Sequence, residues 1–419
     1  MRTKTLGIAL LISSLLGATL PAFAGPVMGK PEPGQPEVDR SLTLSQLVEE
    51  TYARLPNNIT VEALATQTKA LQRLGRGWFG NAPSAYGSYR SDQPYKDTGT
   101  VEGELGVDLP LPNWGQRSAA KQMANEAAQV QTARTRALRL NVAGLVREAI
   151  WNLRLAQNRF HFAEDSLEAS QKLFDSVQKR VAKGDLARSN QLLAKTDLLQ
   201  KKGEYTRSEA ILKQAEATFE NLTGRKLPPA GARETQSTID RITPEHPLLA
   251  TARAQLGLDT ARLKWTRAKG AGNAVLGLGI RRDRADRQLP YDNSALITLS
   301  IPFATGAYSA PGIAEANMAR SEAAVHYRHL EHTLELGLIH ARQTVTADRA
   351  ELDAARERAQ LATEYLDMNR KAFSAGEIDL FTLLRIQSET QAARLEAGQR
   401  AILLRRDTAR YNQASGVLP

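Results

Sequence analysis

The chain has 419 residues, of which 42% are hydrophobic, 24% charged and only 5% aromatic. Lys and Arg number 55 against 45 Asp and Glu, and both signs are interleaved along the chain, so the charge pattern does not favour a nucleic-acid partner. No cysteine is present, which excludes disulfides, thiol catalysis, cysteine metal sites and a lipid anchor on cysteine. The few aromatic and many aliphatic residues favour long helices.

Residues 1–24 have the pattern of a secretory signal peptide. Basic residues precede an apolar stretch over residues 6–20, and residues 21–24 end in the small side chains of a cleavage site. The apolar stretch is shorter than the ~20 residues that span a bilayer, which favours export over an N-terminal membrane anchor. Residues 25–40 contain four prolines and are expected to form an extended leader.

An internal repeat organises the rest of the chain. At an offset of 192 residues, Pro110, Gly184 and Gly224 recur as Pro302, Gly376 and Gly416. We therefore expect a first structural repeat at residues 41–224 and a second at residues 243–416. Residues 225–242 are expected to link the two at the equator of the molecule.

The first helices of each repeat are short. Residues 42–48 are expected to open a helix, and residues 60–76 to form a second one, capped by the polar residues 57–60. In the second repeat, Thr243 is expected to cap the matching helix, with Pro244 at its first position.

Strands are expected next, at about residues 84–109 and 274–301. Apolar and polar residues alternate over 101–109 and 297–301, which is the period of a strand with one apolar face. Two hairpins cannot close a barrel by themselves, whereas three copies of the chain would supply twelve strands. In that arrangement the polar Asp108 and Ser300 face the lumen, and the lipid-facing residues are Val101, Leu105, Val107, Ile297 and Leu299.

Aromatic residues lie near the expected strand ends, at Trp78, Phe79, Tyr86, Trp114, Phe303 and Tyr308. Rings at such positions form interfacial girdles in membrane barrels. Ordinary packing where a strand meets a helix is the alternative explanation.

A long helical hairpin follows the strands in each repeat. Apolar residues recur every seven positions, as Val146, Leu153, Phe160, Leu167, Phe174 and Val181, and the offset gives Leu338, Val345, Leu352, Ala359, Leu366 and Phe373. This period specifies a supercoiled helix, which over residues 118–183 would be ~99 Å long at ~1.5 Å per residue. Gly184 and Gly376 are expected to end the long helices and start their return.

This ordered set of motifs, present twice, resembles the TolC-type outer-membrane efflux proteins over residues 41–416. The resemblance rests on the opening helix, the two strand-to-helix junctions at residues 107–112 and 299–303, and the two tips. It implies a mainly α fold with a small membrane β-barrel portion, in which a homotrimer forms a twelve-stranded barrel and a twelve-helix duct. The length and the missing lipid-attachment cysteine look closest to members that serve heavy-metal exporters.

The resemblance also implies the function and its partners. Such a chain lies in the outer membrane of a Gram-negative bacterium, with most of its residues in the periplasm. It is a passive duct that receives substrate from an inner-membrane pump through a periplasmic adaptor, in tripartite efflux or type I export. The alternative function is a soluble periplasmic coiled-coil adaptor or scaffold, which membrane fractionation would distinguish.

The resemblance places adaptor docking and a gate at the inner tips. The expected docking residues are Gly184, Asp185, Gly376 and Glu377. Many members carry acidic residues six and nine positions after the second tip glycine, where this chain has Thr382 and Arg385. Thr382 and Arg385 put an acidic ring there in doubt. Asp379, with Glu377 and Asp185 nearer the turn, could supply negative charge instead, although acids beside a helix N-terminus also serve as caps.

No enzyme signature is found in the sequence. Four histidines, His326, His329, His332 and His340, have spacings that could bring two imidazoles together, but three at i, i+3 and i+6 drift around a helix. An exposed helix surface explains them better than a metal site. The sequence contains no His-Glu-x-x-His motif, phosphate-binding Gly-Lys-Ser/Thr loop or nucleophile elbow, so neither catalysis nor a cofactor is expected.

Overall fold

The computed structural model describes residues 38–419, except residues 57, 94, 304 and 305. The chain divides into two units, Met1–Glu37 and Val38–Pro419. The predicted signal peptide and nearly all of the predicted leader lie outside the described residues. The second unit contains α1 (Leu44–Arg54), α2 (Asn58–Arg76), β1 (Ser84–Ser91), β2 (Val101–Pro110), α3 (Gln116–Ala182), α4 (Arg188–Thr223), α5 (Pro247–Lys269), β3 (Val275–Arg284), β4 (Asp292–Ser300), α6 (Gly306–Ala375) and α7 (Leu380–Ala414).

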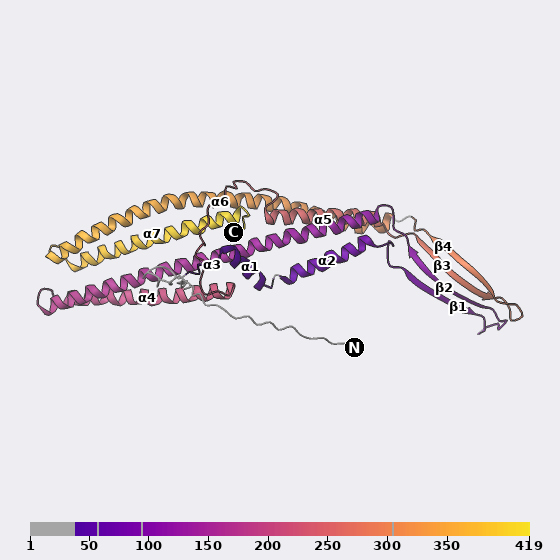
Figure 1. Ribbon diagram of the computed structural model, residues 1–419, viewed down its shortest axis with the longest axis horizontal. Coiled ribbons are helices and arrows are strands. Elements are labelled where there is room, and N and C mark those ends of the chain that lie inside the picture. Colours follow the sequence, from indigo (N-terminus) through magenta and orange to yellow (C-terminus); the bar gives the residue numbers. More distant parts are fainter. Residues whose placement is uncertain (1–37, 57, 94, 304–305) are drawn as a thin grey trace, which may run out of the picture. The chain divides into compact units, whose positions relative to one another are not determined.

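The order helix, strand, strand, long helix, return helix occurs twice in this unit. The long helices α3 and α6 have 67 and 70 residues, which at ~1.5 Å per residue makes each about 100 Å long. Helix α3 packs along α4 and α2, and α6 packs along α7 and α5 (Figure 1). As expected, α2 contacts the long helix that α4 is too short to cover. Among the described helices, none is both long and apolar enough to cross a membrane.

The seven-residue series forms much of the seam between each long helix and its return helix. In the second repeat Leu338, Val345, Leu352, Leu366 and Phe373 are buried. In the first repeat Val146 and Leu153 are buried, as are Leu198 and Phe219 of the return helix. The middle of the first series is only half-buried, at Phe160, Leu167 and Phe174. The apolar period therefore marks the packed faces of both hairpins.

Two helix starts differ from those expected. The first helix begins at Leu44, because Thr43 and Gln46 exchange hydrogen bonds in a capping box. Helix α5 begins at Pro247 with His246 as its N-cap, and not at Pro244. The His246 backbone N–H instead donates to the Thr243 carbonyl, which makes the segment before α5 a turn. Pro247 suits the first helical position for the same reason as Pro244 would have, a fixed φ and no N–H to satisfy.

The four strands form one antiparallel sheet in the order β1-β2-β3-β4. The two expected hairpins are joined by pairing of β2 with β3, where Val107 lies opposite Leu278 and Leu105 opposite Ile280. Because α3 starts six residues after β2 and ends at the first tip, its length separates the sheet from that tip by about 100 Å.

Candidate functional site

One face of the sheet is apolar over the part nearer the helices, and Arg282 and Arg284 lie on the same face toward its far end. Residues opposite each other on neighbouring strands share a face, and Val107 lies opposite Ala85 on one side and Leu278 on the other, with Leu278 opposite Ile297. Leu105 is 64% exposed and Ile297 74% exposed. The register therefore puts on one face all five residues predicted to meet lipid, which are Val101, Leu105, Val107, Ile297 and Leu299.

The opposite face of the sheet is polar and carries its own bonding network. Glu102 forms ion pairs with Arg281 at 3.1 Å and with Arg90 at 3.6 Å. The Tyr86 hydroxyl donates to Glu104 at 2.9 Å. A Cβ on Gly106 would lie 2.5 Å from the Tyr86 ring, so a glycine is needed where this ring crosses the neighbouring strand. Asp108 and Ser300 share this face, as predicted from the alternation.

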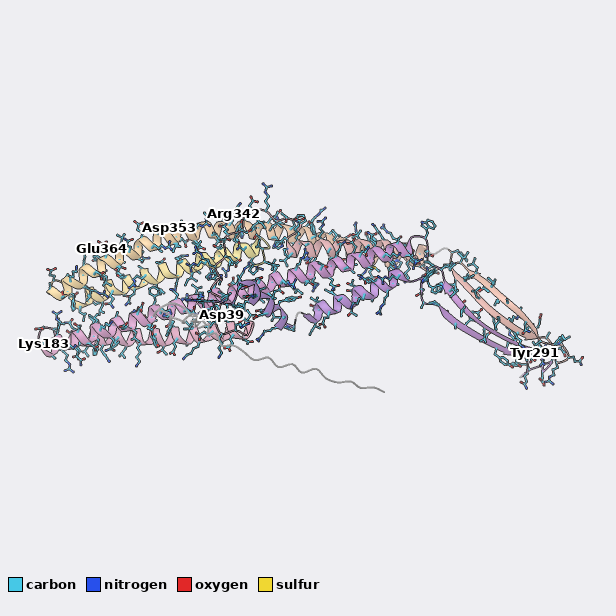
Figure 2. All side chains as sticks on the ribbon, in the orientation of Figure 1. Asp39, Lys183, Tyr291, Arg342, Asp353 and Glu364 are labelled. Carbon is cyan, nitrogen blue, oxygen red and sulfur yellow. The ribbon has the colours of Figure 1, made fainter. Side chains whose placement is uncertain are left out.

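Exposed aromatic side chains lie at both ends of the sheet. The end next to the helices carries Trp78, Phe79, Trp114, Phe303 and Tyr308, and the other end carries Tyr89, Tyr95 and Tyr291. Arg282 and Arg284 each lie within 5 Å of the Tyr291 ring, which is labelled in Figure 2. Tyr86, the third residue of β1, also lies near a strand end as expected, but its side chain is on the polar face and therefore does not join a lipid-facing girdle.

The two tips have the same backbone geometry. Gly184 has a φ of 83° and Gly376 a φ of 84°, in the left-handed region that favours glycine. The N–H of Asp185 donates to the Arg180 carbonyl, and the N–H of Glu377 donates to the Ala372 carbonyl, which is the Schellman pattern of a helix end. Asp185 and Glu377 thus close the preceding helices, and neither lies in the first turn of the helix that follows.

The residues considered for a gate lie at the start of α7. Asp379 is the N-cap, and its carboxylate accepts the Thr382 N–H at 2.9 Å, which lowers the pKa of Asp379. Arg385 forms an ion pair with Glu389 at 3.2 Å one turn later. At the matching place in the first repeat, Ala187 caps α4 without a side-chain bond. The capping role of Asp379 is therefore realised, and only the second tip has it.

A shared apolar cluster joins the two tips just behind the turns. Val177 of α3, Ala194 of α4, Phe373 of α6 and Leu383 of α7 belong to it and are all buried. Arg180 extends over the Phe373 ring, 5.2 Å from its centroid. Both hairpins therefore end in one packed unit with exposed turns.

The four histidines lie exposed along α6. In the part of the chain that the structure describes, no three His, Asp or Glu side chains are grouped so that they could hold a metal ion.

The sequence analysis missed a buried arginine that fixes the linker and the C-terminus to α3. Arg147 is 3% exposed and donates to both carboxylate oxygens of Glu234, at 2.8 and 2.7 Å. It also donates to the Gln413 side chain at 2.6 Å and to the Val417 carbonyl at 3.1 Å. Asn412 completes the set with a bond to Glu234 at 3.1 Å. The repeat offered one signal of this role, because the residue 192 positions after Arg147 is the apolar Ile339.

Known proteins are similar to this chain in fold over most of its length and in sequence over about half of it. The chain is 24% identical over 208 residues to the cobalt-zinc-cadmium resistance protein CzcC of Cupriavidus metallidurans, a match that covers 47% of this chain. The match covers 48% of CzcC, so the chain spans about half the length of that curated relative.

Solved outer-membrane proteins share the fold over most of the chain. VceC of Vibrio cholerae superposes with a TM-score of 0.71 at 15% identity, covering 89% of this chain and 96% of VceC. CusC, whose structures concern folding and transmembrane channel formation, gives a TM-score of 0.70 at 16% identity, covering 90% of this chain and 92% of CusC. Residues 84–225, from β1 past the end of α4, match the outer membrane efflux protein family. The resemblance inferred from the sequence is thus confirmed: residues 84–225 match the outer membrane efflux protein family, and the fold is shared with solved outer-membrane proteins over most of the chain.

Proposed function

We propose that the chain is the outer-membrane channel of a tripartite efflux system, a passive homotrimeric duct that carries substrate out of the cell. The observation that carries this proposal is the two-faced sheet, apolar and exposed on one side and charged on the other. An exposed apolar surface of this extent needs lipid or a partner to cover it. In a soluble periplasmic adaptor or scaffold, the alternative function, a protein partner would have to cover this face in place of lipid.

The sheet supports a barrel made from three copies. Among the described residues no strand pairs with the outer edge of β1 or of β4, and open edges do not occur in lipid. Four strands from each copy give the twelve strands of a closed barrel. The ten residues of β2 span about 33 Å, which at the usual tilt matches the ~25 Å apolar band of such barrels, with aromatic rings at both ends.

The helices support the same assembly. Exposed apolar residues of α6 form two series with spacings of seven or fourteen residues. The first is Met318, Val325 and Ile339, and the second is Leu361 and Met368. Leu361 and Tyr365 also line a shallow groove of about 500 Å³ on this helix. Stripes with this period are the seams of coiled coils, and a neighbouring copy would cover them.

We expect an obligate trimer whose subunits do not persist as folded monomers, because these stripes and the sheet edges are satisfied only between copies. Native mass spectrometry of the detergent-extracted protein measures this directly. A stable monomer or dimer would contradict it. Recovery of the protein in the soluble periplasmic fraction, without a heat-modifiable membrane species, would favour the adaptor alternative.

Metal cations are the substrate class that we propose, because CzcC is named for resistance to cobalt, zinc and cadmium. No cofactor or catalytic role is part of this function. Resistance of a deletion strain to these three metals, with and without the gene, tests the substrate class separately from channel assembly.

The tips are the proposed contact with the periplasmic adaptor, through Gly184, Asp185, Gly376 and Glu377. The start of α7, with Asp379, Thr382 and Arg385, is the proposed gate. These turns are exposed and lie about 100 Å from the sheet, on the side where an inner-membrane partner would approach. Asp379 already accepts a bond from its own helix, so its charge is only partly available to a cation.

Replacing both tip glycines by valine is expected to abolish export-dependent resistance while leaving the trimer abundant. The positive φ of these turns costs a non-glycine residue about 1–2 kcal/mol each, and more for a β-branched one. No atom lies within 4 Å of an added Cβ at either glycine, so the change acts on the turn and not on packing. Trimer level by fractionation and resistance in a deletion strain are measured together.

Gly203→Val is the matched control, since Gly203 has equally open surroundings in α4 but no positive φ. Resistance that survives the double tip change, or a trimer that disappears with it, would show that the tips are not a separate docking element.

A further inference from the structure

A pair of buried carboxyl groups lies between α6 and α7, where the repeat leads one to expect small apolar residues. Asp348 of α6 is 7% exposed and Asp407 of α7 is 4% exposed. At an offset of 192 residues their counterparts are Ala156 and Ala215. The first hairpin thus fills this layer with two alanines, and the second fills it with two acids.

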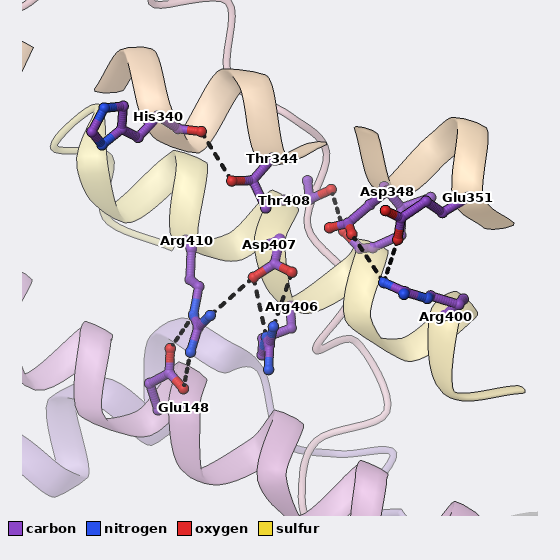
Figure 3. A network of polar contacts seen from close by, with 11 residues as sticks. Glu148, His340, Thr344, Asp348, Glu351, Arg400, Arg406, Asp407, Thr408 and Arg410 are labelled. Carbon is purple, nitrogen blue, oxygen red and sulfur yellow. Dashed lines mark hydrogen bonds and ion pairs between the residues drawn. The ribbon is translucent and has the colours of Figure 1, made fainter. Parts of the chain in front are cut away.

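The neighbouring layers show that the two acids face each other across the seam. Val345 and Tyr411 share one apolar cluster on one side of them, and Leu352 and Leu404 line one cleft on the other side. In antiparallel helices this spacing sets Asp348 opposite Asp407. In Figure 3 both carboxyl groups lie between these helices, Asp407 in contact with Arg406 and Arg410 and Asp348 in contact with Arg400.

The bonds of the two acids are unequal. Asp407 accepts hydrogen bonds from Arg406, at 3.1 and 3.0 Å, and from Arg410 at 3.1 Å. Asp348 has Arg400 at 3.9 Å from its Oδ1, and its buried Oδ2 has no hydrogen-bond partner. An unpaired buried oxygen is costly as an acceptor, but as an O–H it could donate to Asp407.

The surrounding charges do not remove this asymmetry. On α6, Glu351 lies close to Arg400 and engages it. On α3, Glu148 accepts two bonds from Arg410, at 2.6 and 3.0 Å. On the linker, Glu234 is held by Arg147. The nearby cations are therefore occupied by Asp407, Glu351 and Glu148, and Asp348 is the acid with the least compensation.

We propose that Asp348 and Asp407 form a proton-binding site in which Asp348 Oδ2 carries a proton donated to Asp407, and that loss of this proton loosens the α6–α7 seam. Burial, the hydrogen bond with Asp407 and the charges of Asp407 and Glu351 raise the pKa of Asp348 to about 6 from its ordinary value of 3.8. At pH 5 Asp348 holds the proton and the seam is closed. Above about pH 6 Asp348 is ionised, and the charge of Asp407 repels it within the seam.

The sign of this effect separates it from ordinary carboxylates. A raised pKa means that the open seam binds fewer protons than the closed seam, so the stability of the seam falls as pH rises from about 4 to above 6. Asp379 and Asp39 have lowered pKa values and contribute in the opposite direction. The first hairpin has no acid at this layer and should not show the effect.

The test uses the full chain in detergent and hydrogen exchange of the two seams. Between pH 4.5 and 8, after correction for intrinsic exchange, the opening equilibrium around residues 341–355 and 400–411 should rise about 25-fold, as pKa values of 3.8 and 6 require. The matching residues 149–163 and 208–219 should stay level. Asp348→Asn, which donates to Asp407 at every pH, should remove the rise, and Asp353→Asn, an exposed acid on the same helix, should not.

Infrared difference spectra between pH 5 and pH 8 give a second readout that does not depend on opening. The wild-type chain should show the band of a protonated carboxylic acid, and Asp348→Asn should lack the Asp348 contribution. The double change Asp348→Ala with Asp407→Ala, which copies the first repeat, should fold and lose the pH response. An Asp348→Asn chain that keeps the wild-type rise or the full band overturns the proposal, as does equal loosening of both seams.

Discussion

Replacing Arg147 by alanine is expected to lower the free energy of unfolding by about 3–5 kcal/mol, because it leaves a buried carboxylate without its partner. The Glu234 side chain is 12% exposed and receives two of the arginine's bonds. Without the two bonds from Arg147, the remaining hydrogen bond to the Glu234 carboxylate would be the one from Asn412, at 3.1 Å. Urea or thermal unfolding of the detergent-extracted protein measures the loss.

The loss should be accompanied by release of the C-terminus. Arg147 also bonds Gln413 and the Val417 carbonyl, which hold the end of the chain against α3. Limited proteolysis near Val417 should therefore be faster in Arg147→Ala than in the wild-type chain. A lower free energy of unfolding without faster cleavage near Val417 would mean that other contacts hold the C-terminus.

Two further variants separate the buried charge from the loss of a long side chain. Arg139→Ala, eight residues earlier on α3, removes a half-exposed ion pair with Glu49 at 3.1 Å and a contact with the Tyr52 ring, and should cost about 1 kcal/mol. Arg147→Met combined with Glu234→Gln removes both charges and should cost less than Arg147→Ala alone. A double variant as damaging as the single one would contradict the argument from an unpaired carboxylate.

Periodic features of the sequence were sufficient to predict most of the fold. The seven-residue series anticipated seams such as Leu153 against Phe219, and the alternation anticipated that Val107 and Leu299 share a face of the sheet. The tip glycines followed from the repeat and have nearly identical φ values. Such features depend on local geometry, which the order of residue types encodes directly.

Single residues whose role depends on distant partners could not be placed in this way. Thr243 and Pro244 looked like a helix start, but Pro247 offers the same chemistry three residues later and is the one used. Tyr86 lies near a strand end, as the sequence predicted, but the face that its ring occupies is set by its bond to Glu104 on the neighbouring strand. Arg147 and Asp348 interact with groups more than fifty residues away in the sequence, and the local sequence pattern does not predict these partners.

Arginine at Val107 is expected to make insertion less favourable by up to about 2–4 kcal/mol near the middle of the bilayer. The amount of trimer inserted in the outer membrane should fall accordingly. Val107 lies on the apolar face between Ala85 and Leu278, and it is 43% exposed. In the proposed barrel this face meets lipid, where a guanidinium has no partner and no water. The heat-modifiable trimer in the membrane fraction is the measured quantity.

Arginine on the polar face at a similar depth provides the matched comparison. Thr298 lies opposite Gly277, which is opposite Asp108, so its side chain emerges one residue from Ile297 but on the polar face. Both Thr298→Arg and Ser300→Arg should leave the inserted trimer near its wild-type level, since in the proposed barrel this face borders the aqueous lumen and Asp108 is a nearby counter-charge. Equal tolerance of arginine at Val107 and Thr298 would mean that the apolar face does not meet lipid. Equal damage at both would mean that the polar face is not open to water, and the proposed lumen would have to be placed elsewhere.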